Sequence, residues 1–199
     1  MLDLNADLIE HHPLQPFLPC NAKLLMLGSF PPPRRRWCMD FFYPNPSNQM
    51  WLIFGKLFFD DSQRLVDTGN RTFRQNDIEK LLNEKGIAVY DTAVAVRRLS
   101  GNASDKDLEI VEKTDLPSLL FRIPACHDIV CTGQKSYSVF TEEYGVSVPP
   151  MGHCNSFMIK DRSCRLWRMP STSRAFPMKL EEKVVYYRNM MLSIGILKG

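Results

Sequence analysis

Short apolar runs alternate along the chain with longer stretches in which apolar residues recur every three or four positions. AKLLMLGSF (residues 22–30), IAVYD (87–91) and HDIVCTG (127–133) each have the length and composition of a buried strand. Glycine or polar residues at the ends of these runs predict tight loops. NSFMIKDRSCRLWRMPSTS predicts a hairpin or two strands, with a turn at residues 160–163.

The stretches with helical periodicity carry start and stop signals. Ser47 is placed to cap a helix over residues 48–59, and Asn76 is placed to cap DIEKLLNEK, which Gly86 ends. The polar stretch RRLSGNASD predicts a loop after the IAVYD strand. Further helices are predicted for LPSLLFRIP, QKSYSVFTEEYG and MKLEEKVVYYRNMMLSIG, the last with Leu180, Val184, Tyr187 and Met191 along one stripe.

This alternation of strands and helices predicts an α/β fold. We expect a single domain over residues 1–199, a three-layer α-β-α sandwich around a central, mainly parallel sheet, with residues 1–21 as an irregular N-terminal extension. In such sheets ligands bind at the carboxyl ends of the strands. The loops after Phe30, Asp91 and Arg168 are therefore the first places to look for a functional site.

Composition limits the class of protein. The 199 residues are 44% hydrophobic and 24% charged, with a net charge of +3, which suits a globular domain and does not by itself indicate a nucleic-acid partner. The six cysteines form no C-x-x-C pair and no zinc-like spacing, so we expect reduced thiols and no metal, iron–sulfur cluster or other cofactor. Without a signal-peptide pattern or an apolar run of about 20 residues, we expect a cytoplasmic monomer with no membrane partner.

The most unusual stretch is MLGSFPPPRRRWCMDFFYPNPSNQMW, in which prolines, arginines and aromatics follow a buried strand. Gly28 has no second and third glycine after it, and FGKLF lacks the other residues of a phosphate loop, so neither standard nucleotide motif is present. Aromatic rings can stack on bases, and Arg34, Arg35 and Arg36 can meet phosphates. The alternative is that the aromatics belong to the core and the arginines form a solvated run.

This stretch resembles the first motif of the uracil-DNA glycosylase superfamily and is closest to its hypoxanthine-DNA glycosylase branch. The matching residues are Gly28-Ser29-Phe30-Pro31, then Phe42-Tyr43, then Pro46-Ser47-Asn48-Gln49-Met50-Trp51. Mismatch-specific uracil-DNA glycosylases carry a similar arrangement. GIAVYDTAVAVRR resembles the second strand of the family, IVCTGQKSYSVF its third strand and helix, and MPSTSRAF the loop that enters the DNA. The similarity covers roughly residues 22–192 in the same order.

The resemblance implies a monofunctional DNA glycosylase that hydrolyses the N-glycosidic bond of a deaminated base, hypoxanthine or uracil, in damaged DNA and so initiates base excision repair. It implies catalytic roles for Asn48, as the residue that positions water, and for Asp91, at the edge of the extruded base. The implied base-binding residues are Gly28, Ser29, Phe30, Phe42 and Tyr43. The implied DNA-binding residues are Arg34, Arg35, Arg36, Arg98, Ser171, Thr172, Ser173 and Arg174.

Each role has a structural alternative. Asn48 also suits a helix start, Asp91 a loop cap, and residues 171–173 a helix entry. An ionised Asp91 would accept from the ring N–H that hypoxanthine, uracil and xanthine share, whereas a protonated one would donate. The sequence indicates no partner for any of the four histidines, and we expect solvated or structural roles for them: His11, His12, His127 and His153.

Three departures from the family pattern keep a second function open. Phe30 stands where the best-known members have Asp or Asn, Met169 where they have a catalytic His, and Arg174 where the closer branch has Pro. These departures favour, as the alternative, a non-catalytic module of the same fold that binds lesions or single strands. A hydrolase of small nucleotides is a third and unrelated possibility.

Overall fold

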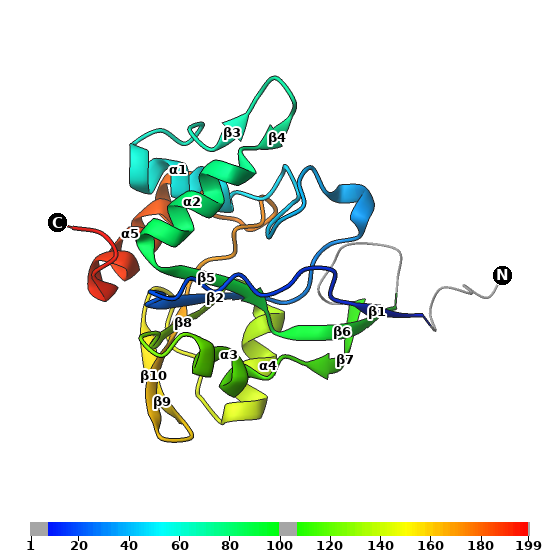
Figure 1. The fold of residues 1–199 in the computed structure, drawn as a ribbon, viewed down its shortest axis with the longest axis vertical. Helices are drawn as coiled ribbons and strands as arrows, with labels where there is room; N and C mark the ends of the chain where they lie inside the picture. Colours follow the sequence, from blue (N-terminus) through cyan, green and yellow to red (C-terminus); the bar gives the residue numbers. More distant parts are fainter. Residues whose placement is uncertain (1–7, 100–106, 199) are drawn as a thin grey trace.

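The computed structural model describes residues 8–99 and 107–198. Its central sheet has five strands in the order β5-β2-β8-β10-β9 (Figure 1). The strands are β2 (Leu24–Gly28), β5 (Ile87–Asp91), β8 (Asp128–Cys131), β9 (Cys154–Ile159) and β10 (Arg162–Arg168). All neighbouring pairs are parallel except β9–β10, which forms the expected hairpin. β2, β5 and β8 are buried at every residue, as in a parallel sheet covered on both faces, which explains their continuous apolar runs.

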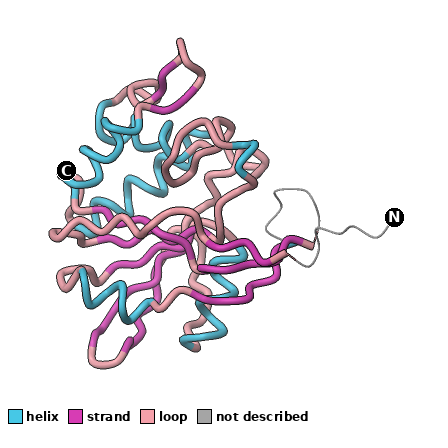
Figure 2. Tube along the Cα trace, turned by 45° about the vertical axis from the view of Figure 1, so that its right-hand side comes forward, coloured by secondary structure: helices cyan, strands magenta, loops and turns pink. Residues whose placement is uncertain are grey.

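Helices cover both faces of this sheet (Figures 1 and 2). One side carries α1 (Met50–Phe59), α2 (Gln75–Lys85) and α5 (Leu180–Ile194), and the other carries α3 (Leu116–Arg122) and α4 (Gln134–Tyr144). The predicted three-layer α-β-α fold is therefore confirmed. All of the predicted strands and helices are present, with boundaries shifted by a few residues.

A second, antiparallel sheet was not predicted. It has the order β1-β6-β7, formed by β1 (Ile9–His11), β6 (Ala93–Arg98) and β7 (Leu108–Lys113). The expectation of an irregular extension over residues 1–21 is thus wrong in part, because β1 pairs with β6 and Phe17 forms a bridge with Val89, while residues 1–7 lie outside the described residues. The expected loop beginning at Arg97 is also wrong in part, since β6 runs to Arg98, and the rest of that loop falls outside the described residues.

Two predicted helix caps differ from the structure. Ser47 donates its hydroxyl to Asn45, whereas Asn48 Oδ1 accepts the Met50 N–H at 2.9 Å at the start of α1. α2 begins at Gln75, so Asn76 lies inside the helix, and no side chain caps it. The predicted end of α2 is confirmed, because Gly86 has a φ of 66° in the left-handed region that glycine adopts without strain. The smaller elements are η1 (Arg34–Arg36), β3 (Val66–Asp67) and β4 (Thr72–Phe73).

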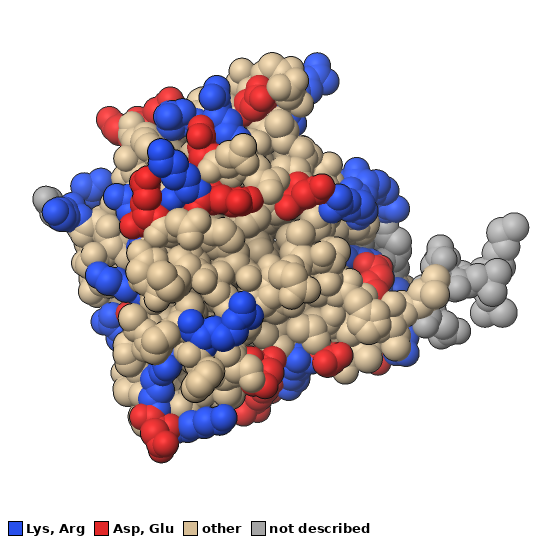
Figure 3. Space-filling view, in the orientation of Figure 1, with Lys and Arg blue, Asp and Glu red and all other residues tan. Residues whose placement is uncertain are grey.

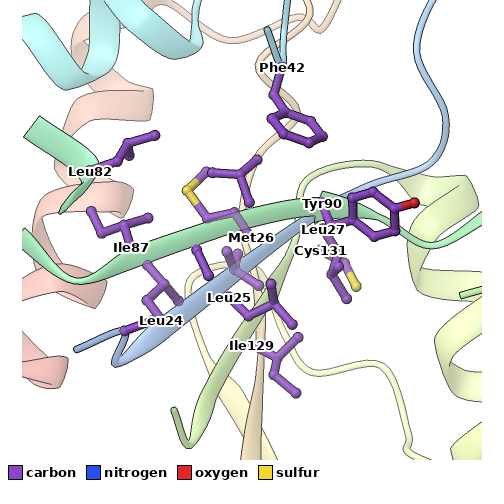
Figure 4. Packing of buried hydrophobic residues seen from close by; sticks show 14 of the residues in the cluster. Leu24, Leu25, Met26, Leu27, Phe42, Leu82, Ile87, Tyr90, Ile129 and Cys131 are labelled. Atoms are coloured by element: carbon purple, nitrogen blue, oxygen red, sulfur yellow. The ribbon is translucent and has the colours of Figure 1, made fainter. Parts of the chain in front are cut away.

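The hydrophobic core joins the sheet to the helices. In Figure 4, Leu82 of α2 and Phe42 lie over β2 and β5, whose side chains include Met26 and Ile87. These four side chains are at most 3% exposed. Burying an apolar side chain of this size contributes about 1.5–3 kcal/mol. The sheet is therefore a firm support for the side chains at its carboxyl edge.

Candidate active site

A cavity of about 720 Å³ opens where β2, β5 and β8 end. Its walls come from segments far apart in sequence, including the loop after β2, the start of α4 and the loop after β10. Among the predicted site residues, those that line it are Gly28, Ser29, Phe30, Arg36, Phe42, Tyr43, Asn48, Asp91, Arg98, Ser171, Thr172 and Ser173. Arg34, Arg35 and Arg174 are outside the lining. The start of α4 was not among the predicted site segments, but it also lines the cavity, with Gly133, Gln134 and Lys135.

Asp91 and Gly28 end adjacent parallel strands and are register partners. The Asp91 residue is 7% exposed, so its carboxylate is largely removed from bulk water. A Cβ atom at Gly28 would approach Asp91 Oδ1 to under 3.0 Å, a separation that real Cβ atoms essentially never show. Gly28 is therefore needed here for space: the carboxylate of Asp91 occupies the place where any other side chain would begin.

His12 is the main functional residue that sequence reasoning missed. Its Nε2 atom lies 2.8 Å from Asp91 Oδ2, and the two residues are 79 positions apart in the chain. The His12 side chain is 2% exposed, and its ring centroid is 5.4 Å from that of Phe30 and 4.7 Å from that of Tyr90. The expectation of a histidine without a nameable partner is thus corrected. No local pattern could have revealed the pair, because only the pairing of β1 with β6 brings His12 to Asp91.

The predicted aromatic wall is part core and part cavity. Phe42 is 3% exposed and packs edge-on against Phe41 and Tyr90, while it also lines the cavity. Tyr43 has a φ of 52°, and its hydroxyl lies 3.1 Å from Thr132 Oγ1. Burial raises the pKa of Tyr43 well above its usual value, which keeps the phenol neutral. Most of the surface of Phe42 is therefore packed in the core, as the structural alternative for these aromatics expects, and only an edge of it lines the cavity.

Asn48 joins the α1 entry to the loop after β10. Asn48 and Ser173 form an antiparallel bridge, and the Gln49 N–H donates to the Thr172 carbonyl at 2.8 Å. The bond from the Met50 N–H to Asn48 Oδ1 agrees with the helix-start alternative. A carbonyl oxygen has two lone pairs, so this bond leaves Asn48 able to accept a second hydrogen.

Lys183 of α5 contacts both sides of this junction between the start of α1 and the loop after β10. The residue is fully buried, and its ammonium group donates to Gln49 Oε1 at 2.7 Å and to the Ser173 carbonyl at 2.8 Å. Burial lowers the pKa of Lys183. A sequence signal for it existed: Lys183 lies three residues after Leu180 and four before Tyr187, so it falls on the apolar stripe of this helix.

The predicted cationic residues differ in their surroundings. Arg98 lines the cavity, but its Nε lies 2.9 Å from Glu10 Oε1 and its guanidinium donates to the Pro31 carbonyl at 2.6 Å. Arg34 pairs with Asp40 and lies over the Trp37 ring. Arg36 lines the cavity, and Figure 3 shows basic side chains gathered over η1. The pairing of Arg98 reduces the positive charge that it presents to the cavity.

Two positions expected to depart from the family pattern are apolar and buried. Phe30 is 8% exposed and packs in a small cluster with Ala93, Val96 and Leu108, beneath the Arg98 guanidinium. Met169 is 2% exposed within the main core. Neither side chain offers a group that could hold a proton or orient a water.

The described residues, 8–99 and 107–198, lack the features of a metal centre and of a membrane span. No group of three or more His, Cys, Asp or Glu side chains in these ranges is arranged to hold a metal ion. The six cysteines are all free. Within the same ranges, the helices are too short or too polar to cross a membrane.

The chain is an α/β sandwich protein, and its cavity lies at the carboxyl edge of the sheet, where proteins of this architecture bind ligands. It is similar to the solution NMR structure of a protein from Methanosarcina acetivorans described as a "putative Uracil DNA glycosylase", with a TM-score of 0.58. The two sequences are 20% identical, and the match covers 92% of this chain and 99% of that one. At this identity the likeness establishes the fold. No family model matches the chain, and no curated protein matches it by sequence.

Proposed function

We propose that this protein is a monofunctional DNA glycosylase that hydrolyses the N-glycosidic bond of a deaminated base, hypoxanthine or uracil, and so initiates base excision repair. The observation that carries the proposal is the convergence of Asp91, Tyr43, Asn48 and the 171–173 loop around one cavity. The cavity of about 720 Å³ is large enough for an extruded nucleotide. The fold shared with the Methanosarcina protein supports the same reading.

The reaction breaks the bond between the sugar C1′ and the base nitrogen. The bonding electron pair leaves with the base, and the sugar becomes an oxocarbenium-like cation that a water molecule captures. The proton lost by that water balances the proton gained by the departing base. The backbone N–H groups of Ser29 and Phe30, beside the cavity, are suited to donate to a base carbonyl as negative charge develops on it.

Asn48 is the proposed water-positioning residue. Its Oδ1 atom already accepts the Met50 N–H, which fixes the side-chain rotamer, and the second lone pair of that oxygen can accept from a water. An amide is a weak base, but capture of an oxocarbenium ion depends more on the orientation of the water than on removal of its proton. Asp91 would contact the ring edge of the base from the other wall of the cavity.

Aromatic and cationic residues would hold the nucleotide and its strand. Tyr43 and the cavity-facing edge of Phe42 are proposed to stack on the base. Ser171, Thr172 and Ser173 would bond the flanking phosphates, with Arg36 and Arg98 beside them. The predicted contacts of Arg34, Arg35 and Arg174 would lie further along the DNA backbone, because these residues are outside the cavity lining.

The decisive experiment is incubation of the protein with duplexes that contain a single deoxyinosine or deoxyuridine, followed by alkali. A monofunctional glycosylase leaves an abasic site, which alkali converts to a strand break, and free base appears in the supernatant. Duplexes with normal bases are the matched control. Absence of breaks at every deaminated base would overturn the proposal.

A lesion-binding module without catalysis is the second candidate, and it is favoured by the burial of Phe30 and Met169 in apolar clusters. These positions supply no proton acceptor, so the chemistry would depend on Asn48 and Asp91 alone. Gel-shift titration with lesion-containing single strands and duplexes separates the two functions. Lesion-dependent binding without release of base identifies the binding module, and steady turnover eliminates it.

A further inference from the structure

The N-terminal segment supplies buried polar partners to two cavity residues. β1 pairs with β6, and the His12 N–H extends this pairing by donating to the Val94 carbonyl at 2.8 Å. This places Glu10 against Arg98 and His12 against Asp91. His12 itself is outside the cavity lining, so it contacts the proposed base-reading carboxylate from behind.

The two carboxylate oxygens of Asp91 have different surroundings. Oδ2 faces His12 Nε2 at 2.8 Å, whereas Oδ1 lies against Gly28, which lines the cavity together with Asp91. Because His12 occupies one oxygen, the free lone pairs of the other are available to a ligand. The remaining question is whether His12 donates to Asp91 or accepts from it, since the answer decides whether Asp91 acts as an acceptor or a donor.

Both backbone groups of Leu14 lie at the far nitrogen of the imidazole, Nδ1. The Leu14 N–H, 3.1 Å away, can donate to Nδ1 when that atom carries a lone pair, which places the proton of the neutral ring on Nε2. If the ring gains a second proton, the Leu14 carbonyl, 2.9 Å from Nδ1, can accept it. In both of these forms Nε2–H can donate to Asp91 Oδ2. The other neutral form, with its proton on Nδ1 towards the Leu14 carbonyl, would accept from Asp91 instead, and spectroscopy of the ring nitrogens distinguishes the two.

We propose that His12 is a positioning residue that holds Asp91 as an ionised acceptor and thereby restricts the site to bases with a ring N–H at the edge that Asp91 reads. This inference rests on the proposed function and deepens it. Hypoxanthine, uracil and xanthine present that N–H. Adenine and cytosine present a ring nitrogen lone pair there, which an ionised carboxylate repels. Deamination of adenine or cytosine converts one pattern into the other, so this acceptor separates hypoxanthine and uracil from their parent bases. Guanine and thymine also carry a ring N–H, and excluding them requires other contacts of the cavity.

The enclosure of His12 keeps the pair in one geometry. Phe30 and Tyr90 pack on its ring, and the side chain is almost completely excluded from solvent. A fixed donor in a site with little water is more effective than the same donor in solvent, because its interaction with Asp91 is less screened. Phe30 thus has a use in this chain as packing for the histidine.

The first test does not depend on activity. A long-range proton–nitrogen spectrum of the ¹⁵N-labelled protein at neutral pH, with His12 assigned by its loss in His12→Gln, should show a protonated Nε2. The signal should change in Asp91→Asn and stay unchanged in the His11→Gln control, which alters the exposed neighbour of His12 on β1. An unprotonated Nε2 would overturn the proposal, because Asp91 would then have to be the donor.

The second test uses a base that has lost its N–H. Duplexes with deoxyinosine and 1-methyldeoxyinosine, or deoxyuridine and 3-methyldeoxyuridine, are compared by single-turnover rate, or by Kd if no base is released. The wild type should strongly prefer the unmethylated base. His12→Phe should reduce that preference about tenfold or more, because one charge-assisted hydrogen bond has been lost. His12→Gln, which retains a donor, should restore most of it.

The outcomes separate the two proposals. Release of unmethylated base with the same preference in His12→Phe, at an unchanged melting temperature, overturns the role of His12 and leaves the glycosylase proposal standing. Binding without release overturns the glycosylase proposal, while a preference that depends on His12 still supports the reading of the ring N–H. Equal treatment of methylated and unmethylated bases by the wild type overturns the inference.

Discussion

The carboxylate of Asp91 has its position because Gly28, its neighbour across the strands, has no side chain. We predict that Gly28→Ala displaces Asp91 and breaks its contact with His12 Nε2. Overpacking of a buried site of this kind costs about 1–3 kcal/mol of folding free energy. Base release should fall by at least tenfold, which single-turnover assays and thermal unfolding together will measure. Gly69→Ala is the control, because its added Cβ would make only ordinary contact, at 3.5 Å, with Asp67. Full activity in Gly28→Ala would refute the assigned role of Asp91.

Asn48 has an observed contact at the start of α1 and a proposed contact with water, and substitution can separate the two. Asn48→Ala removes both the proposed water contact and the bond to the Met50 N–H, so it should slow base release and also cost about 1 kcal/mol of stability. Asn48→Asp keeps an acceptor for the same N–H and for water, and we expect it to retain stability and most of the activity. Lesion binding should change little in either variant, because water placement matters mainly in the transition state. Normal release rates in Asn48→Ala would return Asn48 to a purely structural role.

At the scale of elements, α5 is linked to two segments of the cavity wall by one ammonium group, that of Lys183. Lys183 connects the side chain of Gln49, at the start of α1, to the backbone of the 171–173 loop at Ser173. We predict that Lys183→Met, of similar length, leaves two part-buried acceptors without this donor and destabilises the protein by about 1–3 kcal/mol in total. The loop should loosen, so that Kd for lesion-containing DNA rises. Lys179→Met, one turn earlier at the exposed start of the helix, is the control.

The titration of Lys183 gives this element a pH signature. Burial lowers its folded-state pKa below the usual 10.5. Between the lowered value and 10.5 the unfolded chain binds more protons than the folded one, so this residue makes stability rise with pH in that interval. The free energy of unfolding is measured for wild type and Lys183→Met from neutral pH to pH 10.5. The wild-type value minus the variant value should increase as the pH rises through this range. A difference independent of pH would contradict the burial of a charged amine.

At the scale of the whole molecule, charge is modest but uneven. The net charge of +3 arises from 25 basic and 22 acidic residues, and basic side chains gather over η1 beside the cavity. We predict that Arg36→Ala and Arg174→Ala each weaken DNA binding for any sequence and reduce the slope of log K against log salt by about one unit. Arg98→Ala should affect the slope less, since Glu10 already pairs with Arg98. Arg122→Ala, in α3 and outside the cavity lining, is the control. Unchanged slopes would make these arginines solvated surface charges.

The sequence by itself determined the strands of the central sheet, the helices that cover it and their order along the chain. Continuous apolar runs predict strands buried on both faces, and helical periodicity predicts the helices that pack on them. Ligands bind at the carboxyl edge of such a sheet, which is where Asp91 and Asn48 were expected. These signals are local, because each depends on residues a few positions apart. β1, β6 and β7 escaped prediction. β1 and β7 are mostly exposed and carry no continuous apolar run, and the three strands are held by pairing with one another.

Tertiary structure alone decided what the site residues contact. His12 reaches Asp91 across 79 positions, Glu10 reaches Arg98 across 88, and Lys183 reaches Gln49 across 134. No periodicity records such pairs, because a buried polar group is satisfied by whichever partner the packing brings within about 3 Å. The sequence thus specified where the strands of the central sheet lie, and the fold decided which polar atoms near their ends are free to meet a ligand.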